Sequence, residues 1–102
     1  MALVKAEYEV TRNFPKEEIY GLTAQMRRAA VSVPSNVAEG AARSGQREFA
    51  QYLNIASGSL SELETQLLIA VDLGYLEQGH SILLQMDEVS ALLSGLRRSI
   101  SK

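Results

Sequence analysis

The chain contains no cysteine, and this absence excludes a disulfide framework, a thiol nucleophile and any cysteine-ligated zinc site. No apolar run approaches the roughly 18 residues that a membrane span needs. The first residues, MALVKAEYEV, have neither a basic start nor the apolar core of a signal peptide. We therefore expect a cytoplasmic protein with no membrane partner.

Proline and strand-like patterns are also scarce. The chain has two prolines, and runs that alternate apolar and polar residues are missing. Ala, Leu, Glu, Gln and Arg are abundant, and all of them favour helices. A chain of 102 residues fits a single domain, 1–102, whose core is large enough to fold without a metal or disulfides.

Apolar residues at helical spacing predict four helices, at about Ala2–Asn13, Leu22–Ala42, Gly45–Leu73 and His80–Ser99. Short connectors make consecutive helices antiparallel, so we predict an all-α, up-down-up-down four-helix bundle.

Particular residues refine this prediction. Pro34 predicts a kink in the second helix, with a break into two helices as the alternative. Ser44 is the expected N-cap of the third helix, and Gly74 is its expected stop. Gly58 is expected to allow a close helix approach.

Apolar residues cover nearly the whole circumference of the third predicted helix over Leu67–Val71, and Leu73 and Leu76 follow. A helix on the surface of a monomer usually keeps a polar outer face. We interpret the segment as a subunit contact. The alternative is that the first helix and the turn around Tyr75 cover it within one chain.

Four segments carry a resemblance to a known family: Phe14-Pro15, the YGLT of Tyr20–Thr23, the SVPSNVAEG of Ser32–Gly40 and the ELETQL of Glu62–Leu67. In this order they resemble the 23S rRNA-intervening sequence protein family over roughly residues 8 to 76. The resemblance implies a compact four-helix bundle. It extends to accessory variability proteins of diversity-generating retroelements, which assemble as pentamers and bind nucleic acid alongside a reverse transcriptase. Those proteins are strongly basic, whereas this chain has a formal net charge of -2.

Small polar residues form a stripe along the second predicted helix and another along the third. At spacings of three or four residues they are Gln25, Arg28, Ser32, Asn36 and Glu39, then Ser59, Glu62 and Gln66. One interpretation is a groove for a ligand or a nucleic-acid backbone. The favoured one is a hydrogen-bonded network that fixes the helix register.

Charge is segregated along the chain. The net charge is +3 over residues 21–47, -7 over 48–88 and +3 over 89–102. The candidate phosphate contacts are Arg27, Arg28, Arg43 and Arg47 on one edge, with Arg97, Arg98 and Lys102 as a second basic end. The alternative is a solvated arginine face, because four Tyr and two Phe make a poor platform for base stacking.

No catalytic or metal site is expected. His80 is the only histidine, and Glu77 precedes it in a turn that also contains Gly79. A carboxylate-bridged metal site in a bundle needs two Glu-x-x-His copies on helices. The serines lack a neighbouring histidine base. We therefore expect no catalytic residue, metal or cofactor.

These observations together favour a non-enzymatic, homo-oligomeric scaffold of the intervening-sequence type, with a pentamer favoured. RNA or DNA is the candidate ligand of its arginine-bearing face. The alternative is a protein-protein adaptor with no nucleic-acid role.

Overall fold

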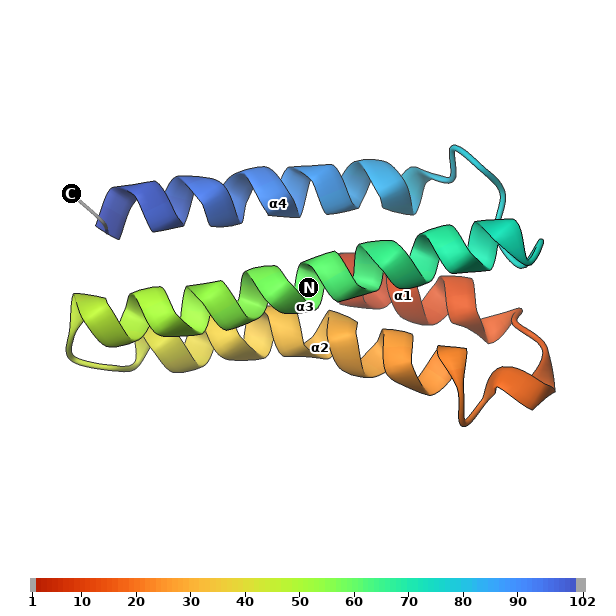
Figure 1. The fold of residues 1–102 in the computed structure, drawn as a ribbon, viewed down its shortest axis with the longest axis horizontal. Helices are drawn as coiled ribbons and strands as arrows, with labels where there is room; N and C mark the ends of the chain where they lie inside the picture. The colour runs from red at the N-terminus through yellow and green to blue at the C-terminus, as the bar shows by residue number, and fades with distance from the viewer. Residues whose placement is uncertain (1, 101–102) are drawn as a thin grey trace.

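Four α-helices account for most of residues 2–100, the part of the chain that the structure, a computed structural model, describes (Figure 1). They are α1 (Ala2–Arg12), α2 (Leu22–Ala41), α3 (Gln46–Asp72) and α4 (Ser81–Ile100), with a short 3₁₀ helix, η1 (Lys16–Glu18), before α2. The predicted all-α four-helix bundle is confirmed. None of these helices has the length and apolar character needed to cross a membrane.

Consecutive helices run in alternating directions along the bundle (Figure 1). The helix ends follow local chemistry. Gly74 has φ +80°, and the N–H groups of Tyr75 and Gly74 donate to the carbonyls of Ala70 (2.9 Å) and Val71 (3.0 Å). This is the hydrogen-bond pattern by which a left-handed residue closes a helix, as expected at Gly74.

The predicted N-cap of α3 is wrong by one residue. Gly45, and not Ser44, takes the N-cap position with extended backbone angles. Its carbonyl accepts the N–H of Phe49 at 3.1 Å, and no side chain caps this end. The backbone of Gly45 therefore begins the helix without help from the Ser44 hydroxyl.

Helix α2 continues through Pro34 as a single helix from Leu22 to Ala41. The alternative of two separate helices is therefore wrong. The kink stays a prediction.

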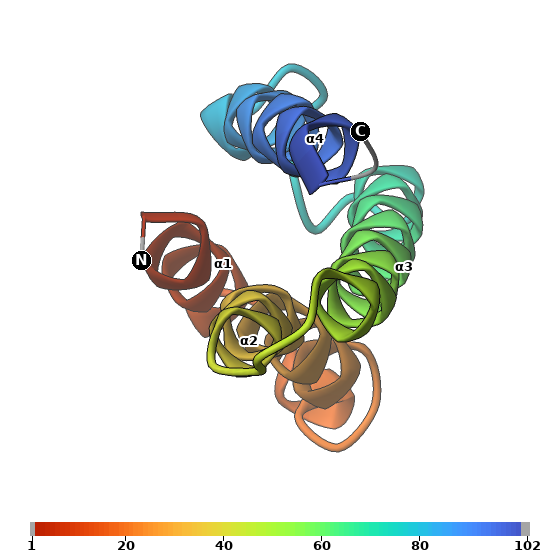
Figure 2. The same cartoon turned by 90° about the vertical axis from the view of Figure 1, so that its left-hand side faces the viewer.

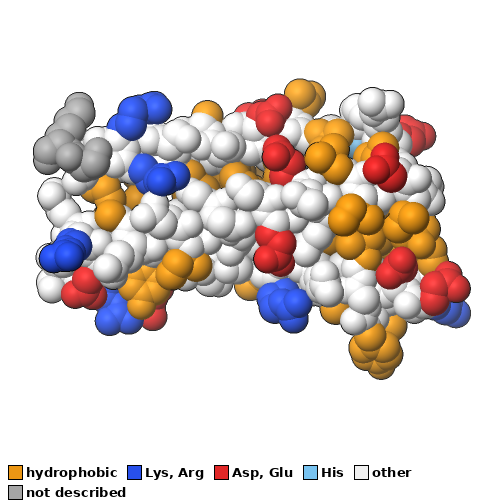
Figure 3. Space-filling view, viewed as in Figure 1, with side chains coloured by type: hydrophobic (Ala, Val, Ile, Leu, Met, Phe, Trp, Pro, Cys, Tyr) orange, Lys and Arg blue, Asp and Glu red, His pale blue; other side chains and the backbone are white. Residues whose placement is uncertain are grey.

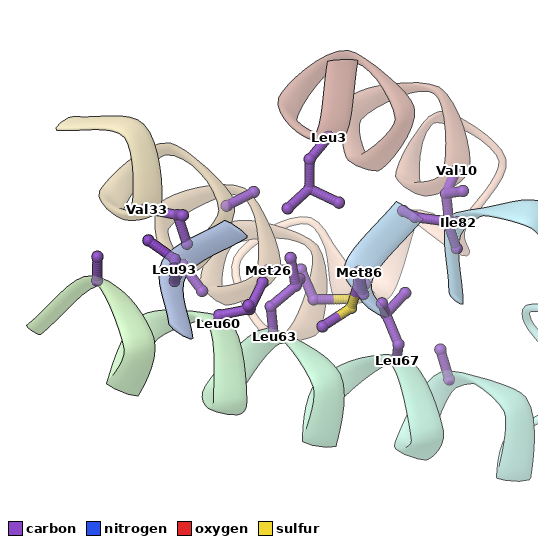
Figure 4. Close-up of a cluster of buried hydrophobic side chains, with 14 of the residues drawn as sticks. Leu3, Val10, Met26, Val33, Leu60, Leu63, Leu67, Ile82, Met86 and Leu93 are labelled. Atoms are coloured by element: carbon purple, nitrogen blue, oxygen red, sulfur yellow. The ribbon is translucent and has the colours of Figure 1, made fainter. Parts of the chain in front are cut away.

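The core is a cluster of buried apolar side chains to which all four helices contribute (Figure 4). Met26, Leu53, Leu63, Leu67 and Ile82 are fully buried. Each such side chain stabilises the fold by about 1.5 to 3 kcal/mol. The packing is uneven: the backbones of α2 and α3 lie along each other most extensively, whereas the backbone of α4 comes close to those of α3 and α1 but not to that of α2 (Figure 2).

The apolar segment of α3 is only half covered. Leu67 and Ala70 face the core, whereas Leu68, Ile69 and Leu73 remain exposed. Neither α1 nor the turn around Tyr75 covers these three side chains. The intramolecular explanation for the apolar circumference is therefore wrong.

The close approach between helices occurs at Gly40 and not at Gly58. A Cβ on Gly40 would lie 2.7 Å from Cβ of Tyr52 and 2.9 Å from Cδ1 of Phe49, so α2 and α3 could not pack as closely with any larger residue. A Cβ on Gly58 would meet nothing within 4 Å. The role that the sequence suggested for Gly58 belongs to Gly40.

We predict that Gly40→Ala and Gly58→Ala change stability in opposite directions. Gly40→Ala should lower the free energy of unfolding by about 1 to 3 kcal/mol, because α2 and α3 must separate to admit the methyl group. Gly58→Ala should raise it by up to about 1 kcal/mol through helix propensity. Urea unfolding of both variants measures this, and a neutral Gly40→Ala would contradict it.

Candidate nucleic-acid interface

The up-down path of the chain brings arginines from three segments to one end of the bundle, where α2 ends, α3 begins and α4 ends (Figures 1 and 3). They are Arg43, Arg47, Arg97 and Arg98. The sequence suggested that the α4 arginines form a separate basic end. In the structure they share one end with the arginines of the α2–α3 connection. Lys102, expected in the same group, lies outside the described residues.

A cavity of about 490 Å³ opens at this end between α3 and α4. Its lining includes Asn54 on α3 and Ser94, Arg97 and Arg98 on α4. Arg97 Nη1 also donates to Ser57 Oγ at 3.5 Å. Guanidinium, amide and hydroxyl groups are the donors that proteins present to phosphate oxygens.

A second cavity, of about 180 Å³, continues along the same two helices. Its lining includes four serines, Ser57 and Ser61 on α3 with Ser90 and Ser94 on α4. These side chains are too short to fill the space between the helices, which is why α3 and α4 pack loosely here. A polar channel therefore extends from the arginine end toward the middle of the bundle.

Arg43 is held by its neighbours on the outside of the bundle. Its Nη2 lies 3.3 Å from Glu39 Oε1 and 3.0 Å from the Tyr52 hydroxyl, and its guanidinium lies 5.3 Å from the centre of the Tyr52 ring. Both members of the ion pair are about half exposed. Such pairs contribute little to stability, so their main effect is to position the guanidinium.

Arg27 and Arg28 do not join this group. Arg27 turns toward α1, where its Nε donates to Thr11 Oγ1 at 3.1 Å and its guanidinium lies 4.7 Å from the centre of the Tyr8 ring. Arg28 is exposed on α2, four turns before the arginine end. The predicted edge of four arginines is therefore not continuous: Arg27 packs against α1, and Arg28 lies alone on the surface of α2.

Three residues of the predicted polar stripes connect α2 to α3. The hydroxyls of Ser32 and Ser59 lie 2.8 Å apart, and Asn36 Nδ2 donates to the carbonyl (2.8 Å) and the hydroxyl (2.9 Å) of Ser32. All three are partly buried. This hydrogen-bonded group links the two helices at one register.

The other stripe residues lie elsewhere. Gln25 and Arg28 are exposed, Glu39 pairs with Arg43, and Glu62 accepts from Gln66 Nε2 at 3.2 Å within α3.

The family model described as 23S rRNA-intervening sequence protein matches residues 1–95, almost the whole chain. The chain belongs to the 23S rRNA-intervening sequence protein family. This confirms the resemblance carried by the segments from Phe14-Pro15 to Glu62–Leu67. Among curated proteins, none matches it.

In this member of the family, the His80 side chain caps the start of α4. Its Nδ1 accepts the backbone N–H of Ile82 at 3.1 Å, which satisfies a donor of the first turn. Within residues 2–100, no group of three or more His, Asp or Glu side chains lies close enough to hold a metal ion.

The residue that the sequence analysis missed is Glu7. It lies on α1 between Leu3 and Val10 and is fully buried, and neither carboxylate oxygen has a hydrogen-bond partner among residues 2–100. Burial raises the pKa of Glu7 to about 7, although the attraction of Arg27 lowers it. Its spacing within the apolar face of α1 was the available signal.

We predict that Glu7 makes the protein less stable as the pH rises. The raised pKa means that the folded state holds the proton more tightly than the unfolded state, so stability is lost between pH 4.5 and 7. Glu7→Gln should remove this loss and raise the free energy of unfolding at pH 8 by about 2 to 3 kcal/mol. Urea unfolding at pH 5 and pH 8 tests the difference.

The matched control is Glu9→Gln, because Glu9 is exposed on the same helix. It should follow the wild type at both pH values. A Glu7→Gln variant no more stable than the wild type at pH 8 would refute the assignment.

Proposed function

We propose that this protein is a non-enzymatic, homo-oligomeric scaffold, with a pentamer favoured, that works in the cytoplasm and binds RNA or DNA through the end that carries Arg43, Arg47, Arg97 and Arg98. The observation that carries the nucleic-acid part is the polar channel between α3 and α4. Arg97 and Arg98 line its mouth, and serine hydroxyls line its length together with the Glu64 carboxylate.

The segregation of charge supports this proposal despite the net charge of -2. Phosphate contacts depend on cations within a Debye length of about 10 Å. Most of the acidic segment 48–88 lies toward the other end of the bundle. The arginine end can therefore attract a polyanion that the molecule as a whole would repel.

The exposed aliphatic side chains of α3 support the oligomer. Leu68, Ile69 and Leu73 lie together over the C-terminal part of α3 (Figure 3). Contiguous apolar surface of this kind typically marks a contact with another protein chain. An oligomer repeats the arginine end, so weak phosphate contacts add through multivalency.

The second candidate is a protein-protein adaptor with no nucleic-acid role. It is favoured by the same exposed apolar side chains and by the small number of aromatic residues available for base stacking. Binding to structured RNA separates the two candidates.

We predict that the wild type shifts structured RNA in a gel at low salt and that the affinity falls steeply as salt is added. The double variant Arg97→Gln/Arg98→Gln should bind about tenfold more weakly or worse and should reduce the salt slope by about 2. The matched control is Arg12→Gln/Lys16→Gln, which removes the same charge from exposed positions at the opposite end. If the RNA is not shifted at low salt while the oligomer is intact, the nucleic-acid role is refuted and the protein-protein adaptor remains.

We also predict that light scattering at micromolar concentration gives a mass of about 56 kDa, that of five chains of 11.2 kDa. A mass of a single chain would contradict the oligomer and would remove the contribution of multivalency.

A further inference from the structure

A small cavity with a basic lining lies at the end of the bundle opposite to the arginine end, where α1 ends, η1 follows and α2 begins (Figure 1). Its volume is about 170 Å³. The lining combines three cations with two hydroxyls and three apolar side chains: Arg12, Lys16 and Arg27, then Thr11 and Thr23, then Phe14, Pro15 and Ile19. None of these lining residues is Asp or Glu. The chemistry of the lining therefore favours an anion.

Two of the segments that carry the family resemblance meet at this cavity. Phe14 and Pro15 form one of them, and Thr23 is the last residue of the YGLT segment. The function proposed above uses neither segment. Phe14 also packs in the core, where its ring centre lies 5.3 Å from that of Tyr75. Packing accounts for the aromatic residue, but it does not account for a buried threonine beside it.

Thr23 is the residue that points to a ligand. It is 4% exposed, and among residues 2–100 its hydroxyl has no hydrogen-bond partner. Thr11 is as deeply buried, but its hydroxyl donates to the carbonyl of Glu7 at 3.0 Å and accepts the Nε–H of Arg27 at 3.1 Å. Buried polar groups in proteins nearly always have a partner. The Thr23 hydroxyl is therefore a donor left unused at the wall of the cavity.

The start of α2 adds further donors at the same place. Helix α2 begins at Leu22, so the backbone N–H of Thr23 belongs to the first turn and has no acceptor within the helix. The N-terminus of a 20-residue helix also carries a partial positive charge that attracts anions. Arg27 follows one turn later, and only its Nε donates to another side chain within residues 2–100. Its two Nη groups remain for a ligand.

Three carboxyl groups lie near the cavity without lining it. Glu7 is buried and is attracted by Arg27. Glu17 is exposed on η1. Both oxygens of Glu18 are engaged, because Oε1 accepts the N–H of Leu22 at 3.3 Å and Oε2 accepts the hydroxyl of Tyr75 at 3.1 Å. An anion in the cavity meets the lining cations first, but these carboxyl groups lower its affinity, which favours an anion with more than one charge.

The size of the cavity narrows the choice of anion. A water occupies about 30 Å³, so the volume of about 170 Å³ holds about six groups of that size. A phosphate group has five non-hydrogen atoms. As a monoester it carries a charge of about -1.5 to -2 at pH 7 and offers three acceptor oxygens. A phosphodiester carries one charge and has a substituent on each side, for which the cavity has no room.

We propose that this cavity binds the phosphate group of a small phosphate monoester. The hydroxyl and N–H of Thr23 and the guanidinium of Arg27 donate to the phosphate oxygens. Arg12 and Lys16 are exposed at the rim and neutralise the remaining charge. This site is separate from the arginine end, so it does not depend on the nucleic-acid role proposed there.

Titration followed by NMR tests the site, with the backbone amide of Ala24, next to Thr23, as the reporter. Inorganic phosphate, added at constant ionic strength, should shift this amide to saturation. Phenyl phosphate, a monoester, should bind at least as tightly. Dimethyl phosphate, a diester, should bind about tenfold more weakly or worse, because it has one charge and two substituents. Binding of inorganic phosphate without phenyl phosphate would overturn the assignment to a monoester.

The decisive variant is Thr23→Val, which keeps the shape of the side chain and removes its hydroxyl. Because this hydroxyl has no partner in the free protein, urea unfolding should show a variant at least as stable as the wild type. Phosphate should nevertheless bind about tenfold more weakly. The matched control is Thr65→Val, the same change at an exposed position of α3, which should bind phosphate like the wild type.

The charged residues provide a second test that separates the two sites. Arg12→Gln/Lys16→Gln should weaken phosphate binding about tenfold and leave the gel shift of RNA with a 5′-hydroxyl end unchanged. Arg97→Gln/Arg98→Gln should have the opposite pair of effects. No saturable shift of the Ala24 amide, wild-type affinity in Thr23→Val, or equal binding of the diester would overturn the phosphate site. None of these results would affect the RNA interface at the arginine end.

Discussion

The close packing of α2 against α3 is the constraint on which the rest of the structure depends. Alanines and Gly40 on α2 let the two helix backbones approach, and the Ser32–Ser59 hydrogen bond joins them at one register. The register of the two helices is therefore specified twice, by the close approach at Gly40 and by the Ser32–Ser59 hydrogen bond. Hydrogen-bonded polar pairs between helices lower stability locally, but they exclude alternative registers of the two helices.

The other helices join this pair less completely, and the candidate sites lie where packing is incomplete. Between α3 and α4, short serine side chains leave a polar channel that ends at Arg97. Between α2 and α4 lies an apolar groove. A chain under selection for core stability alone would fill both spaces with larger apolar side chains, because a void forfeits dispersion contacts.

Helix positions were readable from sequence because their causes are local. Pro15 disfavours the helical conformation at Phe14, so α1 ends before it, and Gly74 supplies the left-handed residue that ends α3. The placement of Gly40 in the α2 seam, seven residues after Val33, was also available in the sequence. Gly58 lies off the corresponding seam of α3, which explains why no side chain approaches it.

The sites were harder to predict because they depend on tertiary contacts. Arg27 and Arg28 are adjacent in sequence, yet only Arg27 contacts α1, through Thr11 and Tyr8. Likewise, an acidic residue at position 7 is compatible with a solvated face until α1 is placed against its neighbours. Its spacing with Leu3 and Val10 places it on the apolar face of α1, but only the packing around Glu7 decides that the whole carboxyl group is buried.

Helix α4 has two sides of different chemistry. Leu92 and Leu96 point into the apolar groove, whereas Ser94 and Arg97 line the polar channel on another side of the same helix. The apolar side chains and the polar channel are therefore separate surfaces of one helix. Because each added copy brings its own arginine end, a chain with a net negative charge can gain affinity for a polyanion by assembling.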